Sequence, residues 1–281
     1  MRTIVHLSDL HFGRVDNALL APLTALVNRL QPDVVVVSGD LTQRARTLQF
    51  QQARAFLDGL PAPQIVVPGN HDIPLHHLFN RFLRPLDKYR RLVTEDLAPS
   101  FIDDEIAIVG INTARSMTFK NGRINTAQIA QVQQRFDGLD AGITKIVVTH
   151  HPFDLPANFD SKHLVGRAPQ AMQAWSNAGA DLFLAGHLHA SVTASTTARY
   201  PIDRYAALVV QAGTATSTRG RGEVNSFNVL RIASTRIEVE RWRWNGSGDF
   251  EHDVTESFAR HANQWSATDA VSAQDGDVPD A

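Results

Sequence analysis

Residues 181–190 read DLFLAGHLHA, and this stretch joins an apolar run to two polar rings. The run from Leu182 to Ala185 predicts a strand buried on both faces, because its residues are continuously apolar rather than alternating. Gly186 ends the run, and His187 and His189 follow it one residue apart. Polar rings at the end of a buried strand point to a ligand site there, because open α/β sheets bind ligands outside the carboxyl ends of their strands.

Four other apolar runs end in the same way. Side chains with acidic, amide or imidazole groups follow the runs at 3–7 (Asp9, His11), 33–38 (Asp40), 64–68 (Asn70, His71, Asp72) and 145–149 (His150, His151). If the sheet is mostly parallel, these ends converge on one edge. The sequence therefore predicts one polar site built from five strand ends.

Strand and helix patterns alternate over the first 190 residues, which predicts a layered α/β domain. A further apolar run lies at 105–111, and helical patterns lie at 17–31, 48–60, 125–139 and 169–179. Asn125 and Gln128 form a capping-box signal, and Gly59 suits a helix C-terminus. Runs at 206–212, 227–232 and 236–242 have no helix between them, so we expect them to form an antiparallel meander.

Composition narrows the functional classes. The chain has 281 residues, a formal net charge of −2 and no cysteine. These values exclude a disulfide framework and give no electrostatic support for binding a nucleic-acid polymer. No apolar run approaches the length of a membrane span, and the first residues do not read as a signal peptide, so we expect a cytoplasmic protein.

Two segments stand apart from the alternating pattern. Residues 76–100 are amphipathic and basic, which fits either a surface helix or a helical lid over a site. Residues 264–281 lack periodicity and become acidic, which predicts a disordered tail after a single domain at 1–263.

A metal centre accounts for the polar strand ends. Buried carboxylates and imidazoles are costly without partners, and a divalent cation supplies one. Mixed nitrogen and oxygen donors suit Zn, Mn, Fe or Co better than Ca or Mg. The donors are too numerous for one ion with an open position, so two ions sharing a carboxylate fit better. Glycines at 39, 69 and 186 would let the backbone turn sharply and come close to the ions.

The ordered motifs resemble those of the calcineurin-like metallophosphoesterases. The chain carries Asp9-Leu-His11, Gly39-Asp40, Gly69-Asn70-His71-Asp72, a His after a strand (His150), and Gly186-His187-Leu-His189, in the family's order and without substitution. The segments HLSDLHFG, SGDLT, PGNHD and HHP are most similar to those of the bacterial branch that hydrolyses cyclic nucleotides and glycerophosphodiesters.

The resemblance implies an α/β fold in four layers, α-β-β-α, with two mixed sheets flanked by helices. It implies that Asp9, His11 and His189 bind one metal ion. It also implies that Asn70, His150 and His187 bind the other, and that Asp40 bridges the two. His71 would act as the proton donor to the leaving group, oriented or charged by Asp72.

Other polar residues are candidates for contacting substrate. Arg44 falls at the position of an arginine in the family's protein phosphatases, and Arg115 and His151 each follow a strand. His76, His77, Arg219 and Arg221 are weaker candidates, and each also fits a surface or capping role. His6 lies inside the first strand and fits a hydrogen-bonded core residue.

The expected activity is hydrolysis of a small phosphodiester, such as a cyclic nucleotide, by a hydroxide activated between two ions of Mn, Fe or Zn. The alternatives are a phosphomonoester or pyrophosphate hydrolase of the same family, for example of the UDP-2,3-diacylglucosamine type, and a non-catalytic metal-binding scaffold. The sequence leaves the natural substrate, the metal pair and the oligomeric state open.

Overall fold

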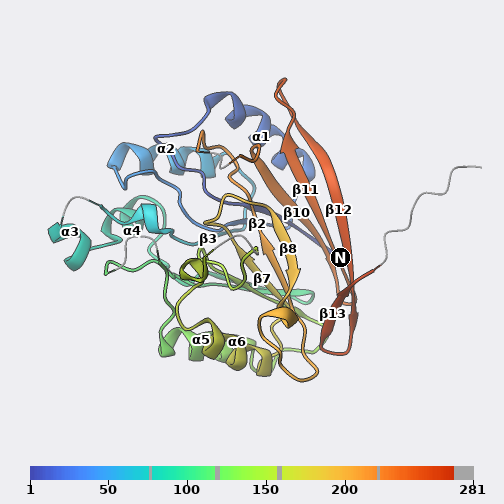
Figure 1. Cartoon of the computed structure of the whole chain (residues 1–281). Coiled ribbons are helices and arrows are strands. Elements are labelled where there is room, and N and C mark those ends of the chain that lie inside the picture. The colour runs from blue at the N-terminus through green and yellow to red at the C-terminus, as the bar shows by residue number, and fades with distance from the viewer. Residues whose placement is uncertain (76–77, 118–120, 157–159, 220–221, 269–281) are drawn as a thin grey trace, which may run out of the picture.

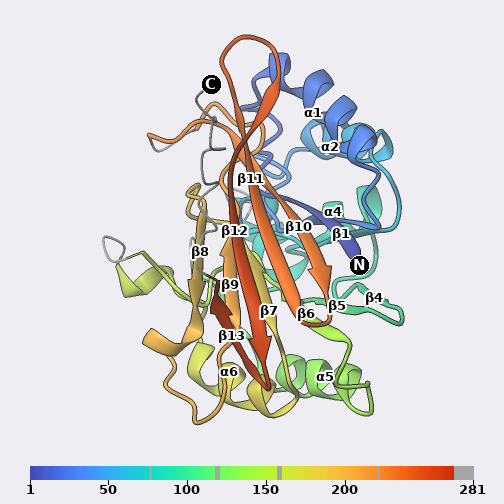
Figure 2. The same ribbon diagram turned by 90° about the vertical axis from the view of Figure 1, so that its right-hand side faces the viewer.

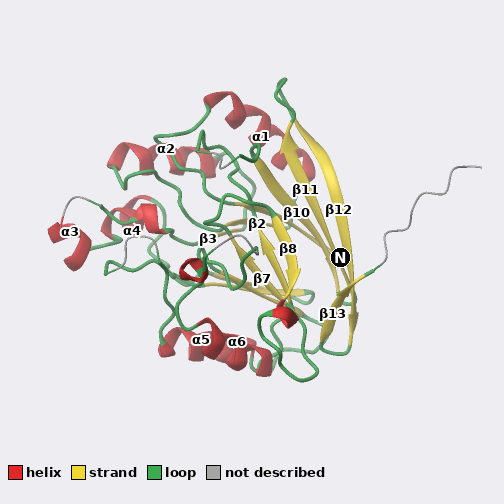
Figure 3. Cartoon of the chain, in the orientation of Figure 1, coloured by secondary structure: helices red, strands yellow, loops and turns green. Residues whose placement is uncertain are grey.

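The computed structural model describes residues 1–75, 78–117, 121–156, 160–219 and 222–268, and its strands form two sheets. The seven-stranded sheet has the order β13-β12-β11-β10-β1-β2-β3 and the six-stranded sheet the order β4-β5-β6-β7-β9-β8. Helices lie above and below the strands in the view of Figure 1, and the colouring of Figure 3 shows the same arrangement. The strands of the first sheet are β1 (Arg2–Leu7), β2 (Val34–Val37), β3 (Gln64–Val66), β10 (Ser226–Ala233), β11 (Arg236–Trp244), β12 (Phe250–His261) and β13 (Gln264–Ala267). The strands of the second sheet are β4 (Ser100–Ile102), β5 (Ile106–Gly110), β6 (Thr144–Val148), β7 (Leu182–Ala185), β8 (Val192–Ser195) and β9 (Leu208–Gln211).

Helices cover the outer face of each sheet. The helices are α1 (Asn17–Leu30), α2 (Thr47–Asp58), α3 (Leu78–Leu83), α4 (Asp87–Leu92), α5 (Thr126–Phe136) and α6 (Ala168–Asn177), and short 3₁₀ turns lie at Asn70–Asp72, Ser161–His163 and Thr196–Ala198. Apolar residues of α1 and α2 pack on alternate residues of β1 and β2, and those of α5 and α6 pack on β5, β6 and β7. The side chain of Asn125 accepts from the Gln128 backbone N–H, so the expected capping box begins α5.

A third core lies between the two sheets. Ile4, Val34 and Val36 of the first sheet belong to the same buried cluster as Ile108, Ile146 and Leu184 of the second. Successive strand residues point to opposite faces, so each central strand needs apolar residues at every position to fill two cores. The continuous apolar runs in the sequence have this cause, and the expected four-layer α-β-β-α arrangement is confirmed.

The expected meander is wrong in its first strand. β9 lies in the second sheet and pairs in parallel with β7, whereas β10 and β11 pair antiparallel as expected. The meander continues through β12 and β13, which Figure 2 shows beside β10 and β11. An apolar run such as LVVQ carries no signal for strand direction, which explains the error. The strand β13 at Gln264–Ala267 also shifts the expected end of the folded chain, while residues 269–281 lie outside the described part.

The segment at 76–100 contains two short helices instead of one long helix. α3 ends at Leu83, α4 begins at Asp87, and Pro85 stands between them, which fits the disfavoured helical conformation of a residue that precedes proline. Phe79, Phe82 and Leu83 are exposed. None of the described helices is long and apolar enough to cross a bilayer.

Candidate metal centre

Two strand ends bring Asp9, His11 and His189 together, because Asp9 and His11 follow β1 and His189 follows β7. The Asp9 Oδ1 atom lies 3.5 Å from His11 Nε2 and 3.1 Å from His189 Nε2, and the two Nε2 atoms are 3.0 Å apart. Donors bonded at 2.0–2.2 Å to one cation lie roughly 3.0–3.5 Å from each other, by the geometry of such bonds. All three side chains are buried. Their spacing therefore fits one divalent ion.

A second group of donors adjoins the first. His150 Nε2 lies 3.2 Å from Asn70 Oδ1, and the His150 and His187 rings have centroids 5.1 Å apart. Asp40 Oδ2 lies 3.4 Å from His150 Nε2 and 3.7 Å from His11 Nε2. Asp40 thus faces both groups, as the bridging carboxylate of a two-ion site must. The donor cluster is the set Asp9, His11, Asp40, Asn70, His150, His187 and His189.

Left-handed backbone conformations aim these side chains. Asp9, His11, Asp40, His187 and His189 all have φ between 52° and 74°, a region that residues other than glycine rarely adopt. Such strain persists only where the surrounding structure enforces it, and it concentrates at functional sites. A Cβ at Gly69 would overlap Asp40, and a Cβ at Gly186 would overlap Ser8 and Asp9. A Cβ at Gly39 would overlap His150, so all three glycines expected to allow close approach do so by leaving room for donors.

The second nitrogen of two imidazoles is held by a backbone carbonyl. His150 Nδ1 lies 2.8 Å from the Ser38 oxygen, and His189 Nδ1 lies 3.0 Å from the Arg219 oxygen. Because a carbonyl only accepts, each Nδ1 carries the hydrogen, and a neutral ring then presents its Nε2 lone pair to the cluster. The buried Asp9 Oδ1 atom has no hydrogen-bond partner among the described residues. These features fit metal ions, and the structure brings the expected ligands together in one cluster.

Charge in the donor cluster favours ionised carboxylates. Burial opposes the ionisation of Asp9, but His189 and His11 outweigh it and hold the pKa of Asp9 well below its usual range. Burial likewise opposes the ionisation of Asp40, and His150 outweighs it and lowers the pKa of Asp40. The same attraction to Asp40 overcomes burial and raises the pKa of His150 to about 9. The two carboxylates therefore attract positive charge to the cluster, and a cation supplies it.

His71 stands beside the donor cluster and faces a cavity. Its backbone N–H donates to Asp40 Oδ1 at 2.8 Å, and its Nδ1 lies 3.0 Å from the Gln43 carbonyl oxygen. The Nε2 atom lies 3.2 Å from Arg219 Nη1. Since guanidinium nitrogens only donate, Nε2 accepts and Nδ1 carries the hydrogen.

Asp72 has other partners than the expected one. Its carboxylate accepts from the backbone N–H groups of Leu41, Thr42 and Gly69 and from the Thr42 hydroxyl, at 2.9–3.1 Å. Burial and the charge of Asp40 raise the pKa of Asp72 to about 7, although the backbone donors oppose this shift. Asp72 therefore joins the loop after β2 to the turn after β3, and its described hydrogen bonds do not include the His71 ring.

The structure places some of the other candidate residues beside the donor cluster and others away from it. His151 lies with His150 and His187 in a group whose donor atoms could share an ion, and its Nδ1 is 2.8 Å from Thr113 Oγ1. Arg44 lines the cavity at His71, whereas Arg115 lines a neighbouring cavity and donates to Gln128 Oε1. His6 is fully buried and bonds Ser38 Oγ, as a core residue should. His76, His77 and Arg221 lie outside the described residues.

Two features of the site were not predicted. His163 lies beside His187, with 3.4 Å between His163 Nδ1 and His187 Nε2. It comes from a 3₁₀ turn in a loop and follows no strand, so the strand-end pattern does not select it. Arg14 and Arg46 join Arg44 and Arg219 around the cavity at His71. Their only sequence signal is their nearness to motif residues.

Known proteins with similar sequences are phosphodiesterases. The chain is 36% identical over 124 residues to a glycerophosphodiester phosphodiesterase from Enterobacter lignolyticus, covering 37% of this chain and 44% of that protein. It is 27% identical over 252 residues to a cAMP/cGMP dual specificity phosphodiesterase from Mycobacterium tuberculosis, covering 82% of this chain and 75% of that one. The match thus spans less than half the length of the first of these relatives.

The fold is shared with a solved dimetal phosphatase from Danio rerio. That structure has a TM-score of 0.64 and 14% identity, covering 89% of this chain and 98% of the other. At this identity the likeness concerns the fold alone. The sequence pattern of the calcineurin-like phosphoesterases matches residues 2–191, which include every residue of the donor cluster. The chain belongs to the calcineurin-like phosphoesterase family.

Proposed function

We propose that the chain is a metal-dependent phosphoric ester hydrolase that acts on a small phosphodiester through two ions held by the donor cluster. The observation that carries the proposal is the position of Asp40, whose Oδ2 lies 3.7 Å from His11 Nε2 and 3.4 Å from His150 Nε2. One carboxylate oxygen within reach of both donor groups supports a shared ligand. The ions would be Mn, Fe or Zn, which accept this mixed donor set.

When bound, two such ions would supply hydroxide near neutral pH and positive charge beside the phosphoryl oxygens. The chain's own residues orient the reaction. Asp9, Asp40 and the imidazoles would hold the ions and so set where the phosphoryl group binds, and His71 lines the adjoining cavity. Proton donation from His71 Nε2 to the leaving oxygen requires that Arg219 release Nε2. The freed Nε2 then takes up a proton from solvent and passes it to the leaving oxygen.

The diester preference is supported by the relatives, both of which are named as phosphodiesterases. A monoester or pyrophosphate substrate is the alternative within the same chemistry. A non-catalytic metal-binding scaffold would keep the same donor residues, so it differs from the enzyme only in the absence of turnover.

Turnover of matched chromogenic substrates tests the proposal. The purified protein is stripped of metal, reloaded with Mn, Zn, Fe or Co, and assayed with bis(4-nitrophenyl) phosphate and 4-nitrophenyl phosphate. We expect metal-dependent turnover with a higher kcat/KM for the diester. A higher kcat/KM for the monoester would refute the diester preference. The absence of turnover with every one of the metals would refute the proposed enzymatic activity.

A further inference from the structure

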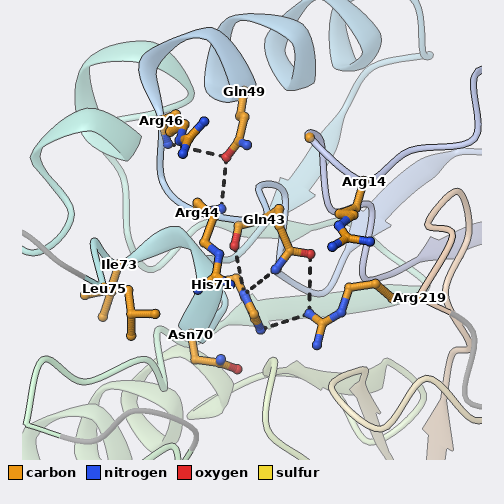
Figure 4. A pocket seen from close by; sticks show the side chains of 11 residues that line it. Arg14, Gln43, Arg44, Arg46, Gln49, Asn70, His71, Ile73, Leu75 and Arg219 are labelled. Atoms are coloured by element: carbon orange, nitrogen blue, oxygen red, sulfur yellow. Dashed lines mark hydrogen bonds between the residues drawn. The ribbon is translucent and has the colours of Figure 1, made fainter.

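A cavity of about 710 Å³ opens beside the donor cluster and is lined by arginines. Its wall includes Arg14, Arg44, Arg46 and Arg219, with Gln43, Gln49, Asn70 and His71 among the remaining residues. We call it the arginine cavity. Among the described residues, its wall contains no acidic side chain. Figure 4 shows His71 between Arg44 on one side and Arg219 on the other.

Three arginines of the arginine cavity have no acidic partner among the described residues. Arg14, Arg44 and Arg46 form no ion pair among the described residues. By contrast, Arg54 lies in α2, the helix that follows Arg46, and pairs with Asp58 at 2.8 Å. Arg46 is also the N-cap of α2, whose first turn has no acidic residue, so the positive end of the helix dipole adds to the field. Like charges gathered around one cavity repel each other, and an anion relieves that repulsion.

The loops that carry these arginines are held in place. The buried Gln49 side chain accepts from the Arg44 backbone N–H at 2.9 Å and from that of Arg46 at 3.4 Å. The Arg14 backbone oxygen accepts from Thr218 N at 2.8 Å, next to Arg219 in sequence. The side chains therefore extend from fixed backbones toward one space, and binding an anion there would order the arginine side chains but not the loops that carry them.

Arg219 connects the arginine cavity to the site of reaction. Its carbonyl oxygen accepts from His189 in the donor cluster, and its guanidinium donates to His71 Nε2 at 3.2 Å. An anion in the cavity would compete with His71 for this guanidinium. The cavity thus adjoins the side of the site on which His71 would meet the leaving group.

We propose that the arginine cavity binds a second phosphate of the substrate, located on the leaving group, so that the preferred diesters carry an additional phosphate. Arginine suits this role because its planar fork donates two hydrogen bonds to phosphate oxygens. The cavity volume is within the range of small-molecule sites and leaves room for the organic part between the two phosphates. This inference rests on the proposed hydrolysis of a phosphodiester.

Dinucleotides that differ by one phosphate test the inference. The metal-loaded protein is assayed with thymidylyl-thymidine and with the same molecule phosphorylated at its 5′ or its 3′ end. We expect kcat/KM to be about tenfold higher for one of the phosphorylated forms, a typical effect of a charge-assisted hydrogen bond at a partly exposed site. Free inorganic phosphate added to the plain dinucleotide should not reproduce this gain, and if it does, the cavity binds a separate anion and the proposal is wrong.

Two variants and a control assign the gain to the cavity. Arg14→Gln and Arg46→Gln should each reduce the ratio of kcat/KM between the phosphorylated and plain dinucleotides, and the double variant should abolish it. Arg29→Gln replaces an exposed arginine in the last turn of α1, outside the cavity, and should leave the ratio unchanged. Equal kcat/KM for all three dinucleotides, or a gain that survives the double variant, would overturn the proposal.

A binding measurement separates this inference from the proposed function. Calorimetric titration of the same protein with thymidine 3′,5′-bisphosphate and thymidine 5′-monophosphate requires no turnover. We expect the bisphosphate to bind about tenfold more tightly, and the double variant to lose that advantage. If no diester is hydrolysed but this binding difference holds, the proposed hydrolysis fails and the anion site stands. If hydrolysis occurs without the difference, the anion site fails alone.

Discussion

The donor cluster and the arginine cavity are adjacent, but they are built in opposite ways. The donor cluster is mostly buried, and five of its residues have strained backbones at strand ends. The arginine cavity is lined by exposed Arg14, Arg44 and Arg46 on loops held by ordinary hydrogen bonds. Buried donors fixed at short mutual distances suit metal ions and a defined reaction. Exposed arginines, which adapt to a ligand at little cost in folding, suit the choice of substrate.

The largest expected effect comes from removing the charge that the two donor groups share. Asp40→Asn keeps the shape of the side chain but removes the carboxylate that faces both groups. We expect loss of at least one ion and of all measurable turnover, measured by elemental analysis and by the diester assay. Asp58→Asn, an exposed exchange of the same kind, is the control. Full activity in Asp40→Asn would mean that the donor cluster is not the site of reaction.

His71 lies at the boundary between the two regions, because its backbone contacts Asp40 and its ring faces the arginine cavity. His71→Ala keeps the backbone N–H that donates to Asp40 and removes the proton donor. We expect both ions to remain and kcat to fall by about 10²–10⁴-fold, most for diesters with poor leaving groups, as for loss of a general acid. Loss of an ion in this variant, or an equal fall for good and poor leaving groups, would contradict the role.

Asp72 supports the backbone under both regions and is expected to affect stability. Asp72→Ala leaves buried N–H groups of Leu41, Thr42 and Gly69 without their acceptor. We expect a loss of about 3 kcal/mol in the free energy of unfolding, measured by urea denaturation of the metal-free protein. If Asp72→Ala instead unfolded like the wild type and lost activity only on poor leaving groups, Asp72 would act through His71 after all.

The last expected effect appears only at low pH and concerns His6, a buried residue of β1. Burial lowers the pKa of His6 to about 3, against an opposing influence of Asp9. The folded protein therefore binds fewer protons at His6 than the unfolded chain does at pH values between about 3 and 6.5, so stability falls as the pH decreases through this window.

Replacing His6 isolates this contribution. His6→Gln cannot take up a proton, so its free energy of unfolding should fall less than that of the wild type between pH 6.5 and pH 4. The difference should approach about 1.4 kcal/mol per pH unit, measured on metal-free protein by urea denaturation. Parallel curves for the two proteins would show that His6 is protonated equally in the folded and unfolded states.

The same contrast explains what the sequence could predict. The donor cluster follows from strand ends, because each donor comes directly after a run such as Leu182–Ala185 and parallel strands bring their carboxyl ends to one edge. The family resemblance then assigned each donor to an ion, and that assignment stays a prediction. The central strands were predictable for a related reason, since burial on both faces leaves a continuous apolar run.

Features that depend on long-range placement were not predictable in this way. Strand β8 (Val192–Ser195) is half buried and has no apolar run, and β9 gives no sign of which sheet it joins. Asp72 was expected to contact its neighbour His71, but the 3₁₀ turn directs its carboxylate to Thr42 instead. Arg14, Arg46 and Arg219 come from three loops, so only the folded chain shows that they line one cavity.

The most direct test of the metal centre is a crystal structure of the protein reconstituted with manganese, with anomalous scattering used to locate the ions. We expect two anomalous peaks, one bonded to Asp9, His11 and His189 and the other to Asn70, His150 and His187, with Asp40 bonded to both. A single peak, or peaks away from Asp40, would contradict the account.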